Sequence, residues 1–298
     1  MRANVSRKPF VLLVLCLLGA PVLRAEEKCF LWKVTKDGNT AYLLGSVHVA
    51  TPDMYPLPKE LYTAFDECKA LAVEADVEKV DMAEMQATVM KKGMYPGADT
   101  LSKKLSKESV DALKAYLDKS GGALMLFEKM KPWLAGLTIS MMEIQKLGFQ
   151  PNLGIDKHFI DKARDKKKVL ELESASFQID LLSGFSDEQQ DKFLRYTLAE
   201  VENMKEDMKV MITAWKKGDA TGLHELLNKG VKKYPDLEPL MKSLVDDRNI
   251  KMAEKVEGYM KSGETTFVIA GALHMTGEQG LVSLLKKKGY TVEQISKK

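Results

Sequence analysis

Histidine and cysteine are scarce in this chain, which has 4 His and 3 Cys among 298 residues. Three cysteines exclude both a scaffold held by several disulfides and a cysteine-rich zinc module. Four histidines suffice for one small metal or acid–base site. The net charge of +3 excludes a strongly basic nucleic-acid-binding surface. What is present, 45% hydrophobic and 29% charged residues, is typical of a folded chain of one or two domains.

Residues 1–25 have the pattern of a secretory signal peptide, with a basic start, an apolar run from Phe10 to Ala20, and Ala25 before two glutamates. An uncleaved anchor is the alternative, although the run is short for a membrane span. We therefore expect a secreted protein, periplasmic in a Gram-negative bacterium. The segment carries four bases and no acid, so its removal changes a net charge of +3 to about −1. Neither a nucleic acid nor an anionic membrane is then indicated as a partner.

The mature chain would keep two cysteines, Cys29 and Cys68. An oxidising compartment permits a disulfide between them, but spacing alone does not establish the geometry, and two separate buried thiols are the alternative. No second apolar run of about 20 residues follows the signal, which argues against a membrane span in the mature protein. Its oligomeric state is left open.

Segments typical of β-strands lie at both ends of the mature chain, and a mostly helical stretch lies between them. The predicted strands are Cys29–Thr35, Thr40–Leu44, Lys69–Asp76, Lys168–Glu173, Thr265–Ala270 and Tyr290–Ile295. The predicted helices are Lys59–Cys68, Asp81–Lys92, Ser106–Lys119, Pro132–Leu147, Ile155–Asp165, Ser186–Lys217, Ala220–Lys229, Glu238–Lys261 and Gly277–Lys288. We predict an α+β fold in a single domain over 26–298. Its mixed sheet would come from 26–78 and 263–298, with 79–262 as a large helical insertion.

Two histidines follow predicted strands in the same way, in the segments GSVH (45–48) and GALH (271–274). The carboxyl ends of strands are where α/β sheets place ligands, and glycine there permits a close backbone approach. Two neutral imidazoles and a carboxylate can hold a divalent ion with positions open for water and substrate. Glu74, an acid inside an apolar strand, is the nearest carboxylate, unless it only pairs with Lys or Arg. His158 and His224 are expected at the surface.

The order of these motifs resembles the TraB/GumN family, which includes the bacterial TraB and PrgY proteins and the animal Tiki proteins. The similarity takes in the segments YLLGSVHVATPDMYPLP, AFDECKALAVEADV, KPWLAGLTISMMEIQKLGFQPNLGIDKHFIDKA, VLELESASFQIDLLSGFSDEQQ, DDRNIKMAEKVEGYM and FVIAGALHMTGEQGLVSLLKKKGYTV. The resemblance implies a fold similar to the erythromycin-esterase and ChaN-like proteins, with a β-sheet core of two related halves. Each half would carry one G-x-x-H motif. Because Tiki proteins are divalent-metal-dependent proteases, the resemblance also implies a metal-dependent activity.

The resemblance assigns residues as well. His48 and His274 match the paired histidines, and Glu74 matches the acid after the first of them. Arg248 falls on the Arg-Asn position, where it would bind a substrate carboxylate or stabilise an oxyanion. Further matches, with roles less defined, are Asp156, His158, Glu173 and Asn249.

We therefore expect a metal-dependent hydrolase, a peptidase acting on a peptide or on a small ester or amide. It would use a divalent ion such as Mn, Co or Zn, and Glu74 or Glu173 would move protons. One alternative is a non-catalytic protein that binds a peptide, haem or metal in the same cleft. A second alternative is a metal-independent, esterase-like hydrolase with His48 or His274 as general base.

Overall fold

The structure is a computed structural model that describes residues 27–76 and 78–298. The predicted signal peptide lies outside this range. None of the helices in the described part of the chain combines the length and the apolar character needed to cross a membrane.

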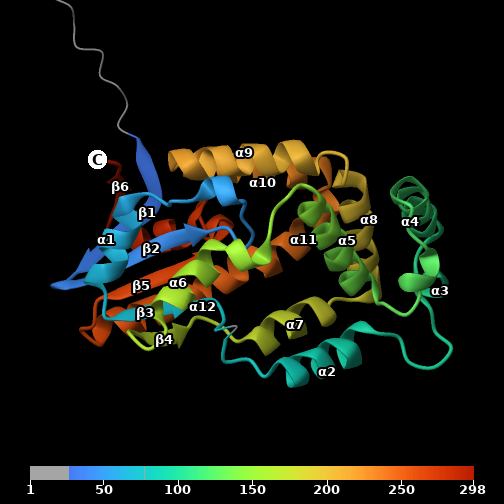
Figure 1. Cartoon of the computed structure of the whole chain (residues 1–298), viewed down its shortest axis with the longest axis horizontal. Helices are drawn as coiled ribbons and strands as arrows, with labels where there is room; N and C mark the ends of the chain where they lie inside the picture. Colours follow the sequence, from blue (N-terminus) through green and yellow to red (C-terminus); the bar gives the residue numbers. More distant parts are fainter. Residues whose placement is uncertain (1–26, 77) are drawn as a thin grey trace, which may run out of the picture.

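A six-stranded mixed β-sheet forms one half of the molecule, with the strands in the order β4-β3-β5-β2-β1-β6 (Figure 1). Strands β1 and β2 form the predicted antiparallel hairpin, and β2, β5, β3 and β4 run parallel to one another. The strands span β1 Lys28–Lys36, β2 Asn39–Ser46, β3 Ala70–Val73, β4 Lys168–Glu171, β5 Thr266–Gly271 and β6 Thr291–Ser296. The predicted α+β class is confirmed, with strands from both ends of the chain in one sheet and β4 added from the middle.

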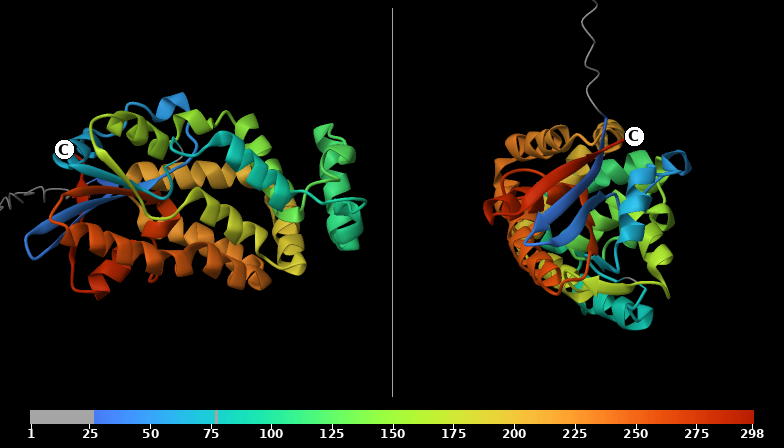
Figure 2. Two further views of the ribbon diagram at one scale, coloured as in Figure 1. Left: turned by 90° about the horizontal axis from the view of Figure 1, so that it is seen from below. Right: turned by 90° about the vertical axis from the view of Figure 1, so that its left-hand side faces the viewer.

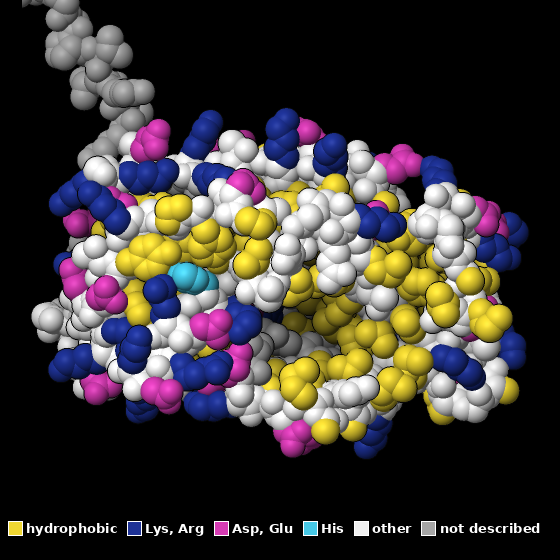
Figure 3. All heavy atoms as spheres, in the orientation of Figure 1, with side chains coloured by type: hydrophobic (Ala, Val, Ile, Leu, Met, Phe, Trp, Pro, Cys, Tyr) yellow, Lys and Arg dark blue, Asp and Glu magenta, His cyan; other side chains and the backbone are white. Residues whose placement is uncertain are grey.

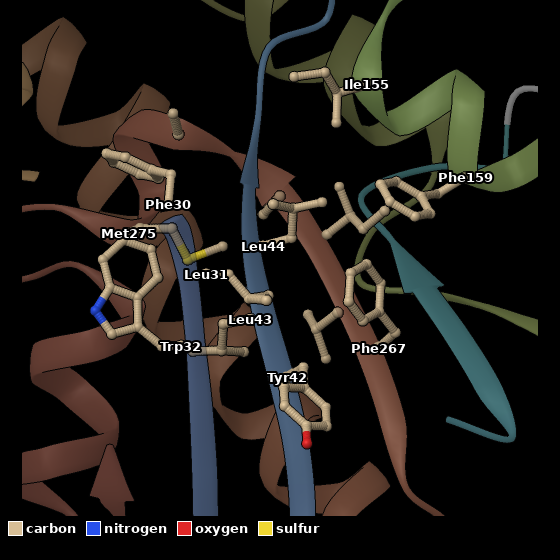
Figure 4. Packing of buried hydrophobic residues seen from close by; sticks show 14 of the residues in the cluster. Phe30, Leu31, Trp32, Tyr42, Leu43, Leu44, Ile155, Phe159, Phe267 and Met275 are labelled. Carbon is tan, nitrogen blue, oxygen red and sulfur yellow. The ribbon is translucent and has the colours of Figure 1, made fainter. Parts of the chain in front are cut away.

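The sheet is buried on both faces, which explains why its central strands are continuous apolar runs rather than alternating ones. All six residues of β5 are buried. On one face, Phe159 packs against Phe65 and Phe267 at ring-centroid distances of 5.1 and 5.2 Å. On the other face lie Phe30 and Trp32, which meet edge to face (Figure 4). This packing fixes the positions of the strand ends that carry the site.

Helices surround the sheet and extend beyond it to form the other half of the molecule (Figure 2). They span α1 Lys59–Glu67, α2 Met82–Gly93, α3 Leu101–Lys104, α4 Lys107–Ser120, α5 Pro132–Lys146, α6 Ile155–Ala163, α7 Ala175–Ser183, α8 Asp187–Glu200, α9 Met204–Lys217, α10 Ala220–Lys233, α11 Glu238–Met241, α12 Asp247–Lys261 and α13 Leu281–Lys287. Helices α4, α5 and α8 bury a second hydrophobic cluster, which includes Leu113, Ile139 and Leu194.

The helix predicted over Ser186–Lys217 is wrong, because the chain forms two helices, α8 and α9, with a turn between them. The amide of Asn203 donates to the carbonyl of Glu200 in this turn. Leu194 of α8 packs in the second cluster, whereas Trp215 of α9 packs in the sheet core. The two halves of the predicted helix thus serve different cores, which a straight helix could not reach.

Other differences from the prediction are smaller. Strand β3 ends at Val73, so Glu74 lies just beyond the strand rather than inside it. Helix α13 begins only at Leu281, after a turn in which Gly277 has a φ of +75°. Helix α7 was not predicted. Cys29 and Cys68 are both buried and free, so they are the two separate thiols and not a disulfide.

Candidate functional site

Four parallel strands each deliver one side chain of the candidate site just past the carboxyl end of the strand. His48 follows β2, Glu74 follows β3, Glu173 follows β4, and His274 lies in the 3-10 turn Ala272–Met275 after β5. Strand β5 lies between β3 and β2, so the last part of the chain brings the first two residues together. This is the edge at which parallel sheets place ligands, as the sequence predicted.

Glu74 occupies the middle of the site. Its Oε1 accepts a hydrogen bond from the backbone amide of Gly271 at 2.6 Å. The same oxygen lies 3.9 Å from Nε2 of His48 and 3.8 Å from Nε2 of His274. A Cβ atom at position 271 would lie 3.3 Å from both Oε1 of Glu74 and Nε2 of His48. The close approach of the carboxylate and the imidazole thus leaves little room for a side chain at this position.

Arg248, at the start of α12, holds the two glutamates from one side. Its Nη2 donates to Oε2 of Glu74 and to Oε2 of Glu173, both at 2.7 Å, and its Nε donates to Glu173 at 2.9 Å. Its Nη1 donates to the carbonyl of Leu244. Burial works against ionised Glu74, but both histidines, Arg248 and the Gly271 amide outweigh it and lower the pKa of Glu74 to about 2. Glu74 is therefore ionised at neutral pH.

His48 lies at the rim of the site, with 58% of its side chain exposed. Its Nδ1 is 3.2 Å from Oδ1 of Asp156, in the first turn of α6. The backbone amide of Ile155 donates to the carbonyl of Val47, which ties the start of α6 to the GSVH segment. The protein around the ring partly desolvates His48, which lowers its pKa, but the hydrogen bond and charge of Asp156 and the charge of Glu74 outweigh this effect. Together they raise the pKa of His48 to about 9.

His274 is buried, with 5% of its surface exposed. Its Nδ1 lies 2.7 Å from Oδ1 of Asn249, and Nδ2 of Asn249 donates to the carbonyl of Gln279. Because Nδ2 of Asn249 is the donor to a carbonyl, its Oδ1 must accept from Nδ1–H of His274. Nε2 of His274 then carries a lone pair and faces Glu74. Burial lowers the pKa of His274 to about 4, which keeps it neutral at pH 7.

His158 is placed away from this group of residues. Its ring packs among Tyr55, Tyr62 and Phe159, at centroid distances of 5.2, 5.8 and 5.3 Å. Burial is the main cause of its lowered pKa. His224, expected at the surface, is half-buried beside Gly277. Asp156 and Asn249, by contrast, join the site as partners of the two histidines.

A cavity of about 240 Å³ opens onto the site. It is lined by Ser46, His48, Val73, Glu74, Ala75, Asp156, Gln178, Ile269 and Ala270. Gln178, on the unpredicted helix α7, donates from Nε2 to Oε2 of Glu74 at 3.1 Å and to Glu173 at 3.4 Å. Gln178 lies within a segment that resembles the family and Ser46 within the GSVH segment, but neither residue was singled out from the sequence. Figure 3 shows a hollow between α5 and α7, lined mainly by hydrophobic side chains.

The donor atoms suit a divalent ion in kind and in orientation. Each histidine uses Nδ1 on an oxygen of a neighbouring residue and turns Nε2 toward Glu74, the arrangement usual for metal-binding imidazoles. Among the described residues, no set of three or more His, Cys, Asp and Glu side chains has the geometry of a formed metal site. His48, His274 and Glu74 are thus a donor set that an ion would still have to draw together.

Comparisons with known proteins agree with this arrangement of motifs. A family model described as the TraB/PrgY/gumN family matches residues 30–294. The chain is 28% identical over 256 residues to the uncharacterized protein YbaP of Shigella flexneri and to that of Escherichia coli (strain K12). In both cases the match covers 85% of this chain and 90% of the relative. No solved structure matches.

Proposed function

The chain belongs to the TraB/PrgY/gumN family, and from this premise we propose that it is a metal-dependent hydrolase that cleaves peptides. The predicted signal peptide would place it outside the cytoplasm. One observation carries the proposal: two imidazole Nε2 atoms lie 3.8 and 3.9 Å from one oxygen of Glu74, and Nδ1 of each ring lies within 3.2 Å of a side-chain oxygen. Such paired orientation is typical of metal ligands and has no evident use in packing alone.

His48, His274 and Glu74 would hold the ion. A bound divalent ion supplies Lewis acidity, since it lowers the pKa of water and polarises a carbonyl group. Because the pKa of His48 is raised to about 9, His48 must release a proton before it can bind a metal, and we expect metal affinity to fall as the pH decreases.

The remaining side chains orient the three proposed metal ligands and offset the charge of the glutamates. Asp156 and Asn249 fix the two rings, and Arg248 neutralises one of the two buried glutamates. Both oxygens of Glu173 accept hydrogen bonds from Arg248, so this carboxylate is engaged by the guanidinium group. Glu74 keeps Oε1 turned toward the histidines, so it is the carboxylate better placed to bind a metal ion. The cavity beside it admits the substrate.

The test uses the mature chain starting at residue 26. Bound metal is measured after dialysis, and a peptide library is assayed with and without a chelator. We expect about one ion per chain and cleavage that stops with the chelator and returns with metal. The double variant His48→Ala/His274→Ala should lose both metal and cleavage.

His224→Ala is the matched control, because it removes a half-buried histidine outside the site. It should keep metal and activity. Cleavage that survives in the double variant would overturn the proposed site. Stoichiometric metal binding without cleavage of any peptide would favour the non-catalytic binder. Cleavage that a chelator leaves unchanged would favour the metal-independent hydrolase.

A further inference from the structure

Large hydrophobic side chains are exposed in the helical insertion. Among the described residues, every exposed large hydrophobic side chain lies between residues 79 and 262. Leu137 and Met141 of α5 are each 38% exposed and lie on one face of the helix, opposite Ala135 and Ile139, which pack in the second hydrophobic cluster. Figure 3 shows a hollow between α5 and α7, here called the apolar hollow, that is lined mainly by hydrophobic side chains. An exposed apolar surface of this kind is typical of a binding site.

Helix α7 connects the candidate site to the apolar hollow. Gln178 lines the cavity at the site and donates hydrogen bonds to both glutamates. Leu181 and Leu182 follow Gln178 by three and four residues, so they lie on the same face of α7, about one turn or 5.4 Å further along. Both leucines are only half-buried, and no residue of α7 is fully buried. The apolar surface of α7 therefore begins beside the cavity that holds Glu74.

Other side chains of α7 hold the helix in place. Nζ of Lys251, on α12, lies 5.5 Å from the centre of the Phe177 ring. Lys92, on α2, forms an ion pair with Asp180. Because these contacts do not involve Leu181 or Leu182, the leucines can be replaced by polar residues without removing the contacts that position α7.

The chemistry of the two neighbouring spaces indicates what would bind there. His48, Glu74 and Asp156 give the cavity charged groups, whereas the face of α7 that follows Gln178 carries leucines. A charged side chain placed against these leucines would lose hydration without gaining a partner, and an apolar side chain would gain from burial. In an extended peptide, side chains two residues apart point to the same side and are about 6 to 7 Å apart. This spacing is close to the step from Gln178 to the leucines.

Resting on the proposed function, we propose that the apolar hollow binds the side chains of the substrate on one side of the scissile bond. The substrates are then peptides with a large apolar residue within two positions of the cleaved bond. Leu181 and Leu182 determine this specificity through contact with the substrate, and they take no part in the chemical step.

The experiment measures the preference of the metal-loaded enzyme between matched peptides. A library of quenched fluorescent peptides first gives a cleaved sequence, and its apolar residue near the cleaved bond is then replaced by alanine or by lysine. For wild type, kcat/KM should be at least about 10-fold higher with leucine than with alanine at this position, and lower still with lysine. In the double variant Leu181→Gln/Leu182→Gln, the ratio of leucine to alanine should fall close to 1. Because the ratio compares two substrates of one enzyme, partial unfolding of the variant would not change it.

Val210→Gln is the matched control, because it replaces an exposed apolar residue of α9 and should keep the wild-type ratio. Equal cleavage of the three peptides by wild type overturns this proposal alone, as does a double variant that keeps the wild-type ratio. Light scattering tests another occupant: a wild-type dimer that the double variant converts to a monomer would show that a second copy fills the hollow, which also overturns the proposal.

A separate binding measurement covers the case in which no peptide is cleaved and the proposed function fails. A dansyl-labelled, leucine-rich peptide is then titrated into chelator-treated protein. Binding that the double variant weakens about 10-fold or more, and that Val210→Gln leaves unchanged, supports the apolar hollow as a peptide-binding surface. Binding that is absent, or equal in all three proteins, overturns it.

Discussion

The ends of β2 and β5 are alike in sequence and different in surroundings. Each carries glycine and then histidine three residues later, and each histidine turns Nε2 toward Glu74. His48 is 58% exposed and binds a carboxylate, whereas His274 is buried and binds an amide. The same motif has thus produced one histidine fixed in the neutral state and one that is charged at neutral pH. A repeated motif does not imply two equal roles.

The largest loss of stability is expected when Glu74 is replaced, because the histidines after β2 and after β5 both face this residue. Glu74→Ala leaves the Gly271 amide without an acceptor and removes one partner of the buried Arg248, so we expect a loss of about 3 kcal/mol in the free energy of unfolding. Glu74→Gln, which keeps an acceptor for that amide, should lose less. Urea unfolding measures both. If Glu74→Ala were as stable as wild type, Glu74 would not stabilise the contact between the carboxyl ends of β2 and β5.

A direct comparison replaces each histidine separately in metal-free protein. His274→Ala creates a cavity and leaves Oδ1 of Asn249 unpaired, which should cost about 2 to 3 kcal/mol. His48→Ala removes an exposed ring and should cost less than about 1 kcal/mol. Urea unfolding of the two variants measures both losses in the free energy of unfolding. Equal losses would show that the two environments are not distinct in solution.

Exchanging the hydrogen-bond partners of the two histidines tests why their pKa values differ. Asp156→Asn removes the charge beside His48, so its pKa should fall from about 9 toward the ordinary 6.5. Asn249→Asp adds a charge beside His274, so its pKa should rise from about 4. NMR titration of the imidazole resonances follows both. Unchanged pKa values would contradict the assigned causes.

The pH dependence of stability in chelator-treated protein gives the finest comparison of the two histidines. The raised pKa of His48 means that the folded state keeps a proton which the unfolded state releases, so this stability is lost as pH rises from 6.5 to about 9. The lowered pKa of His274 has the opposite sign, and stability is lost as pH falls from 6.5 to about 4. His48→Ala should flatten only the alkaline side of the profile, and His274→Ala only that part of the acid side. If His48→Ala flattened the acid side, or His274→Ala the alkaline side, the pKa shifts would be assigned to the wrong histidines.

Much of the site was predictable because strand ends are local features of the sequence. The GSVH and GALH segments follow apolar strands, and this was enough to predict that the two histidines converge. The family pattern added Arg248, Asn249 and Asp156, which no local signal would have brought to the same place. Gln178 was missed because its helix, α7, has no fully buried residue and so no clear apolar stripe. The break between α8 and α9 was missed because it depends on two separate cores, which the helical periodicity of either segment does not show.

The pairing of β2 with β5 also sets when the candidate site can form. Glu74 and the Gly271 amide that binds it are 197 residues apart, and Arg248 is 174 residues from Glu74. Helices of the insertion are held by local contacts and can form early, but these contacts must wait until almost the whole chain has been made. A growing or truncated chain that ends before β5 would hold Glu74 without the Gly271 amide and without His274. The order of synthesis itself would therefore leave the candidate site incomplete in an unfinished molecule.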